Sequence, residues 1–366
     1  MIPFKRSKFP KLTIIQKLCL FFILLTPVLL ILSKSLWILL FLVRSVSNLH
    51  VVPNFSWKLQ EYNPVKVNDY YMEKSQNDSK NPMTKISNNL YNTLHIYDYI
   101  INEPDKCKEN VPFLVLLITV ERWQQEVRQV IRNTWAKEDL LPGVRILRLF
   151  FLGKEMKPNT EAQQDILQES EEFHDIIQQD YLDSYKNLTI KTIMAMNWIT
   201  TYCPNALYVM KIDSDVFVNI GYLVNKLLKP DQEPKTNYIT GFLMLNNLPI
   251  RDRDSKWYVS PNLYPYKKYP PFCSGTGYVL SGDLARKIVK ISPSVRWIHL
   301  EDVFIGLCLD KLGVQPVAPP KTSDFNIWYV EYSDCEFHNI VTSHYASLGM
   351  LQHYWDRLER TKHLCA

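Results

Sequence analysis

The feature that most constrains the fold is a series of short apolar runs with helix-like segments between them. Residues 113–120 and 207–212 have strand length and almost no charge, which is typical of strands buried on both faces. A third run, 145–152, follows a segment of helical spacing at 121–137, and another helical segment, 185–202, precedes 207–212. This alternation predicts an α/β fold with a mostly parallel central sheet and helices on both faces.

Further elements follow from the same patterns. We expect helices at 160–173, 282–290 and 299–312, and short strands at 175–179 and 278–280.

Two acids, Asp213 and Asp215, directly follow the run at 207–212, with Ser214 between them. Ligands of parallel sheets bind at the carboxyl ends of the strands, which is where this turn lies. Carboxylates there are costly unless a cation or hydrogen bonds satisfy them. The pair therefore either caps a turn or helps to hold Mg²⁺ or Mn²⁺ against phosphate oxygens, with Asp215 as the direct ligand and Asp213 near a ribose or a metal-bound water.

A second acidic pair, Glu301 and Asp302, opens the helix expected at 299–312. Acids in a first helical turn interact favourably with the helix dipole, which would explain the pair without any chemistry. The functional alternative is a general base that takes a proton from an attacking hydroxyl group.

Other candidate residues are ambiguous when each is considered alone. Arg128 and Arg132 share one helix face, as many solvated pairs do, and a single histidine such as His344 is more often a structural residue than a ligand. Gly275 and Gly277 form a G-x-G without the dinucleotide-binding fingerprint, so we expect them to admit a ligand close to the backbone or to form a sharp turn.

The N-terminal region predicts membrane anchoring. Residues 18–43 are almost uninterrupted by charge, and the five basic residues of 1–17 precede them. By the positive-inside rule, 1–17 is a cytoplasmic tail and 18–43 a signal-anchor helix, followed by a luminal stem at 44–106 and a luminal domain at 107–366. A cleaved signal peptide is the alternative, but the apolar stretch is long and no clear cleavage site follows it.

The part after the anchor has the features of a luminal glycoprotein. Seven basic residues and no acid lie within 1–44, so the formal net charge of +5 leaves −2 for the rest, which excludes nucleic-acid binding by charge. Three N-glycosylation sequons begin at Asn54, Asn77 and Asn187. Six cysteines suit up to three disulfides, whose pairing the sequence leaves open: Cys107, Cys203, Cys273, Cys308, Cys335 and Cys365.

Several segments together resemble the β-1,3-galactosyltransferases of glycosyltransferase family 31. The matching segments are 128–135, 150–153, 183–192, 208–219, 250–252, 255–258, 269–278, 301–308 and 362–365, so the resemblance covers about residues 107–366.

The resemblance implies a GT-A type nucleotide-sugar-binding fold in a single-pass type II Golgi membrane protein. It implies a metal-dependent, inverting hexosyltransferase that moves galactose from UDP-galactose in β-1,3 linkage onto a glycan acceptor, commonly a terminal N-acetylglucosamine on a glycoprotein or glycolipid. The expected ion is Mn²⁺, with Mg²⁺ as the alternative.

The resemblance also implies roles for individual residues. Asp213 and Asp215 match the family's metal motif, His344 matches a histidine that completes the metal shell, and Asp302 matches the catalytic base. The nucleotide-sugar contacts would include Arg128, Arg132, Lys191, Asp213 and Ser214. The donor or acceptor pocket would include Trp257, Tyr258, Gly275, Gly277 and Glu301.

Two departures leave the donor and acceptor open. Ala136 stands where glycine is usual, and residues 246–248 replace a glycine-bearing stretch. The alternatives are a β-1,3-N-acetylglucosaminyl- or N-acetylgalactosaminyltransferase of the same fold, or a non-catalytic luminal glycan-binding protein.

Overall fold

A computed structural model of the chain describes residues 97–157 and 159–365. The predicted cytoplasmic tail, the predicted membrane anchor and most of the predicted stem lie outside these residues, as do Asn54 and Asn77. Within the described ranges, no helix combines the length and the apolar character needed to cross a bilayer.

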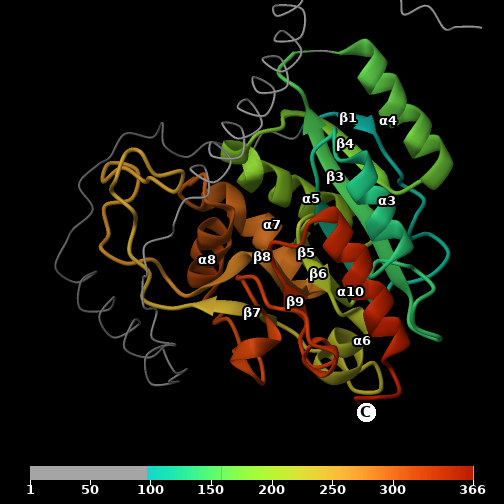
Figure 1. Cartoon of the computed structure of the whole chain (residues 1–366). Helices are drawn as coiled ribbons and strands as arrows, with labels where there is room; N and C mark the ends of the chain where they lie inside the picture. The colour runs from blue at the N-terminus through green and yellow to red at the C-terminus, as the bar shows by residue number, and fades with distance from the viewer. Residues whose placement is uncertain (1–96, 158, 366) are drawn as a thin grey trace, which may run out of the picture. The chain divides into compact units, whose positions relative to one another are not determined.

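A seven-stranded sheet forms the centre of the described chain (Figure 1). Its strands lie in the spatial order β1-β4-β3-β2-β5-β8-β7. Their bounds are β1 Tyr99–Ile101, β2 Leu114–Thr119, β3 Ile146–Lys154, β4 Ile176–Leu182, β5 Tyr208–Asp213, β7 Ile239–Met244 and β8 Phe272–Ser281. Two further strands, β6 (Phe217–Val218) and β9 (Thr342–Ser343), pair with each other outside this sheet.

The sheet is mixed and mostly parallel. Strands β4, β3, β2 and β5 run parallel to one another, and β8 lies antiparallel between β5 and β7. The α/β class and the predicted strands are therefore confirmed. The segment expected as a short strand at 278–280 is the end of the ten-residue β8, because the glycines before it lower its strand signal.

The start of the folded region differs from the prediction. Strand β1 (Tyr99–Ile101) pairs antiparallel with β4 and so belongs to the sheet, although it lies inside the range predicted as stem, 44–106. Its three residues are too few to show the alternating pattern by which a strand is recognised. The sheet therefore includes β1, ahead of the domain boundary predicted at residue 106.

Helices cover both faces of the sheet, as its two-sided burial requires. The longer ones are α3 Gln125–Asn133, α4 Thr160–Phe173, α5 Leu188–Tyr202, α7 Gly282–Ile291, α8 Glu301–Leu312 and α10 Leu348–Arg360. The shorter ones are α6 Ile220–Tyr222 and α9 Asp334–Phe337, with helical turns at 185–187, 223–228, 292–294 and 322–324.

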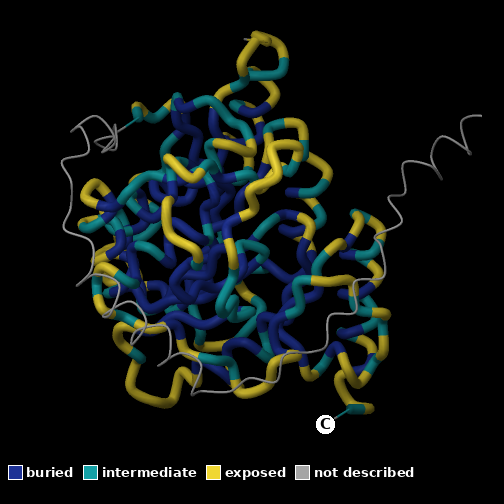
Figure 2. The backbone as a smooth tube through the Cα atoms, turned by 90° about the vertical axis from the view of Figure 1, so that its left-hand side faces the viewer, coloured by how far each residue is buried: buried dark blue, intermediate teal, exposed yellow. Residues whose placement is uncertain are grey.

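Alternation along the strands divides the core into two layers. Leu116 of β2 and Met210 of β5 face the cluster that contains α3 and α10, whereas Val115 and Val209 face the cluster of α5, α7 and α8. All four side chains are fully buried. Figure 2 shows that buried residues fill the interior of this part of the chain and that exposed segments lie around them.

Two disulfides form in the described chain. Cys107 pairs with Cys203 and Cys335 with Cys365. The other two candidates, Cys273 and Cys308, are buried free thiols, so only two of the three possible bridges are present.

These bridges generate a stability prediction, because their loops differ in length. Their sequence separations are 96 and 30 residues. Replacing Cys107 and Cys203 by Ala should lower the free energy of unfolding by about 1 kcal/mol more than the matched replacement of Cys335 and Cys365, since the longer loop constrains the unfolded chain more. Denaturant titration measures both losses, and an equal or reversed order would contradict the loop-entropy explanation.

Candidate active site

Lys211 lies at the centre of the site although the sequence reasoning did not select it. The residue is 2 % exposed, and its side chain extends from β5 toward α8. The ammonium group donates to Asp213 Oδ1 at 2.6 Å and to the carbonyl oxygen of Gly275, and lies 3.7 Å from Glu301 Oε2. Burial alone lowers the pKa of Lys211, but Asp213 and Glu301 outweigh it, so the pKa is raised and the side chain stays charged.

Asp213 is held by two neighbours at one oxygen. The Thr119 hydroxyl donates to Asp213 Oδ1 at 2.8 Å, and the ammonium group of Lys211 donates to the same atom. Thr119 is the last residue of β2, which pairs in register with Asp213 at the end of β5. The parallel pairing of β2 and β5 therefore sets the orientation of this carboxylate.

Asp302 and Glu301 reach the same place from the first turn of α8. Asp302 Oδ1 accepts the backbone N–H of Val303 at 2.8 Å, and Oδ2 accepts that of Gly275 at 3.2 Å. Burial raises the pKa of Asp302, and the two N–H groups only partly offset this. A Cβ added at Gly275 would lie 3.0 Å from Glu301 Oε2, so a glycine permits this close approach of β8 to α8.

Glu301 is the more enclosed of the two acids. It is 7 % exposed, and its Oε1 accepts the Tyr278 hydroxyl at 2.6 Å. Burial raises the pKa of Glu301 to about 7, although Lys211 acts in the opposite direction. Asp302 is the less buried of the two acids.

His344 and Asp215 meet because β6 and β9 pair just beyond them. His344 Nε2 lies 3.4 Å from Asp215 Oδ2, and Nδ1 lies 2.9 Å from the carbonyl oxygen of Ile327. A carbonyl only accepts, so Nδ1 donates to Ile327; Nε2 donates to the Asp215 carboxylate when the ring is charged and has a free lone pair when the ring is neutral. Burial lowers the pKa of His344, but its bonds to Asp215 and Ile327 outweigh this and raise it.

The donor set fits a divalent ion that is held only partly by protein. A carboxylate and an imidazole whose second nitrogen is fixed by a carbonyl are suitable ligands for Mn²⁺. The structure does not bring the predicted third ligand, Asp213, into a common cluster with Asp215 and His344. Across residues 97–157 and 159–365, no group of three or more His, Cys, Asp or Glu side chains could hold an ion.

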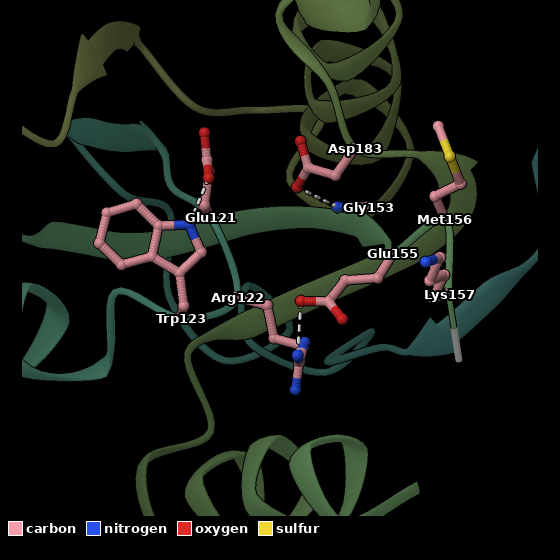
Figure 3. Close-up of a pocket in the computed structure, with 8 residues that line it drawn as sticks. All are labelled: Glu121, Arg122, Trp123, Gly153, Glu155, Met156, Lys157 and Asp183. Atoms are coloured by element: carbon pink, nitrogen blue, oxygen red, sulfur yellow. Dashed lines mark hydrogen bonds and ion pairs between the residues drawn. The ribbon is translucent and has the colours of Figure 1, made fainter. Parts of the chain in front are cut away.

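A cavity of about 300 Å³ lies at the carboxyl ends of β2 and β3 (Figure 3). Gln124 links it to the acidic turn, because its Oε1 accepts both the Glu121 backbone N–H at 2.8 Å and the Ser214 hydroxyl at 3.2 Å. The residues around the cavity are Glu121, Arg122, Trp123, Gly153, Glu155, Met156, Lys157 and Asp183.

Lys191 supports the cavity wall from behind. Its ammonium group donates to the Val120 carbonyl at 2.7 Å and to Asp183 Oδ2 at 2.9 Å, and the residue is 2 % exposed. Burial lowers the pKa of Lys191, and Asp183 only partly offsets this. The side chain therefore orders the end of β2 and does not point into the cavity as a nucleotide contact would.

Arg128 and Arg132 are engaged in a buried ion-pair network and do not face the cavity. Arg128 makes two bonds to Glu169 and donates to the carbonyl oxygens of Glu121 and Arg122. Arg132 pairs with Glu169 and with a second buried carboxylate, that of Asp175. Both guanidinium groups thus have buried carboxylate partners, and Arg128 also holds the loop that borders the cavity; their role in nucleotide binding stays a prediction.

Gly277 and Trp257, two of the predicted pocket residues, have different surroundings. A Cβ on Gly277 would lie 2.5 Å from Ile212 Cδ1, so Gly277 packs strands together and does not border a ligand. Trp257 is exposed and hydrogen-bonded to Tyr185, whose phenol is within electrostatic range of Asp302 and Asp213. Lys256 Nζ lies 4.6 Å from the centre of the Trp257 ring.

Tyr258, a predicted pocket residue, and Asn187, a predicted glycosylation site, make other contacts. Tyr258 forms a backbone bridge with Ile250 in the segment between β7 and β8. Asn187 donates its side-chain amide to the Leu182 carbonyl at 2.8 Å, and Thr189 of the same sequon is buried with its hydroxyl on Ile298. Glycosylation at Asn187 stays a prediction.

Comparison with known proteins identifies the family. The profile described as galactosyltransferase matches residues 126–320, and one described as β-1,3-galactosyltransferase 2 N-terminus matches 42–115. β-1,3-Galactosyltransferase 2 of Homo sapiens is 56 % identical over 272 residues, which cover 74 % of this chain and 64 % of that protein. β-1,3-Galactosyltransferase 1 of Mus musculus is 48 % identical over 270 residues, covering 74 % and 81 %. The chain belongs to the β-1,3-galactosyltransferase family.

The extent of these matches differs. The chain spans less than two thirds of the length of the human relative. Among solved structures, a glycosyltransferase involved in the glycosylation of the major capsid of PBCV-1 aligns with a TM-score of 0.32 and 12 % identity, over 67 % of this chain and 99 % of that one. A likeness this distant carries no weight here.

The raised pKa of Glu301 predicts how stability depends on pH. The folded state binds this proton more tightly than the unfolded state, in which the pKa is near 4.5. The resulting stabilisation is complete below about pH 4.5 and is lost as the pH rises through about 7, on the order of 3 kcal/mol in total. We expect Glu301→Gln to flatten this part of the stability–pH curve.

Denaturant titration at several pH values measures this effect. Replacement of the exposed Glu233 by Gln is the matched control and should leave the slope of the curve unchanged. An identical slope for the Glu301→Gln variant and the parent would show that Glu301 is ionised throughout the range.

Proposed function

We propose that the chain is an inverting β-1,3-galactosyltransferase that moves galactose from UDP-galactose onto a hydroxyl group of a glycan acceptor. The observation that carries the proposal is the meeting of three elements around Lys211. Asp213 comes from β5, Gly275 from β8, and the Glu301–Asp302 pair from α8. With Asp213 as the donor-side carboxylate and Asp302 as the base, this arrangement would bring both into one site. It is compatible with a GT-A type fold.

Asp302 is the proposed general base. It would take the proton from the acceptor hydroxyl as that oxygen attacks the anomeric carbon, and a single displacement inverts the centre. The N–H groups of Val303 and Gly275 hold one carboxylate oxygen each, so the group is aimed before substrate arrives. Its raised pKa makes it a stronger base than an exposed aspartate.

The cavity beside the acidic turn is the proposed uridine site. Trp123 offers an exposed ring for stacking on a base, and the Glu121 and Asp183 carboxylates can accept hydrogen bonds from ribose hydroxyls or the base. Lys191 and Arg128 would act indirectly, since both hold the backbone at the end of β2. Tyr185 and Trp257, near Asp302, would face the sugar or the acceptor.

Asp215 and His344 are the residues that would hold Mn²⁺, or Mg²⁺ in its place. When bound, the ion would supply positive charge that neutralises the departing diphosphate. Asp213 keeps one oxygen on Lys211 and Thr119, so we assign it to the nucleotide-sugar or to a metal-bound water.

We also propose that the protein is a type II Golgi membrane protein with its catalytic domain in the lumen. The two disulfides support an oxidising compartment. The match of residues 42–115 to the N-terminal region of β-1,3-galactosyltransferase 2 supports the same organisation. The acceptor would then be a glycoprotein or glycolipid glycan.

A donor panel tests the proposed reaction. We expect the full chain with Mn²⁺ to transfer from UDP-galactose to N-acetylglucosamine acceptors at least about tenfold faster than from UDP-N-acetylglucosamine or UDP-N-acetylgalactosamine, because a pocket shaped for a 2-hydroxyl has no room for the N-acetyl group. Radiolabelled transfer measures the rates. Preference for either N-acetylated donor would replace galactose in the proposal.

The base assignment predicts the effect of Asp302→Asn. The variant should lose about 10²- to 10⁴-fold in kcat, which is the contribution of a positioned base, and should keep Mn²⁺-dependent UDP binding. Asp231→Asn on the surface is the matched control and should behave as the parent. Turnover that survives in the Asp302→Asn variant would remove this residue from the mechanism.

A further inference from the structure

The Lys211 ammonium group contacts three structural elements at once. Its partners are Asp213 at the end of its own strand, the Gly275 carbonyl on β8, and the Glu301 carboxylate at the start of α8. Asp213 and Gly275 accept hydrogen bonds from the ammonium group, whereas Glu301 Oε2, 3.7 Å away, interacts with it as an ion pair.

These contacts form a continuous path between the two sides of the proposed site. Lys211 joins Asp213 Oδ1 to Gly275, and the backbone N–H of Gly275 donates to Asp302 Oδ2 at 3.2 Å. Thr119 and Lys211 occupy only Oδ1 of Asp213, whose side chain is 32 % exposed.

We propose that Lys211 is a positioning residue for sugar transfer. It holds the donor-side carboxylate of Asp213 and the base Asp302 at one fixed spacing through Gly275. The proposal rests on the function proposed above and adds to it a residue that touches neither the transferred sugar nor the acceptor. Misplacing a reacting group by about 1 Å can cost about 100-fold in rate, so loss of a residue that fixes this spacing should lower the rate of transfer.

A purely structural role is the competing explanation. Glu301 is buried, and a buried carboxylate needs a cationic or hydrogen-bonding partner. If Lys211 only neutralised Glu301, then removing both charges together would make the lysine dispensable. If it positions Asp213 and Gly275, removing Glu301 cannot compensate for its loss.

The experiment compares Lys211→Met, Glu301→Gln and the double variant in the full chain. Lys211→Met alone leaves buried carboxylates unpaired and is expected to fold poorly. In the double variant, Met replaces the apolar stem of the lysine, and the amide oxygen that Glu301→Gln introduces can still accept the Tyr278 hydroxyl. We therefore expect thermal unfolding of the double variant within a few degrees of the Glu301→Gln variant.

Activity and binding then decide between the roles. We expect the double variant to stay at least about 100-fold below Glu301→Gln in kcat and to bind UDP in the presence of Mn²⁺ about tenfold more weakly by calorimetry. Recovery of both quantities to the Glu301→Gln level would overturn the positioning role.

The wild-type chain separates this test from the test of the proposed function. No transfer by the wild type from any UDP-sugar would refute the proposed function alone, and UDP affinity would still decide the role of Lys211. Transfer by the wild type together with full recovery in the double variant would refute the positioning role alone.

Discussion

The site depends on one buried positive charge, that of Lys211. A lone ammonium group in a protein interior is strongly unfavourable, so it persists only where carboxylates surround it. Asp213 and Glu301 contact it, and Asp215 and Asp302 lie within its electrostatic range. Because these acids come from β5, the turn after it and α8, satisfying the lysine requires those elements to pack in a single arrangement. The same arrangement collects the acids that the proposed chemistry needs.

Much of the fold follows from local sequence patterns. The runs at 113–120 and 207–212 formed β2 and β5 because apolar side chains on both faces of a strand require cover on both sides. The helix expected at 160–173 has the predicted bounds, since Asn159 caps its first turn. Strand β1 and the pairing of β6 with β9 were not predicted, because segments of two or three residues carry no periodic signal and are fixed by their partners.

The site was only partly predictable for a related reason. A run that ends in Asp213 and Asp215 marks a strand end, and the structure places Thr119 and Lys211 on Asp213 and His344 on Asp215. Sequence spacing could not reveal that Arg128 and Lys191 face inward, since their acidic partners, Glu169 and Asp183, lie on other elements. The one signal that would have revealed Lys211 was a charged residue in the middle of a buried strand.

Diffraction at the manganese absorption edge, from crystals of the protein grown with Mn²⁺ and UDP, tests the central claim most directly. The account predicts a single anomalous peak in contact with an Asp215 oxygen and His344 Nε2, with Asp213 still bonded to Lys211 and the Asp302 carboxylate in the same cleft. An ion bound by other residues, or an Asp302 side chain directed away from that cleft, would contradict it.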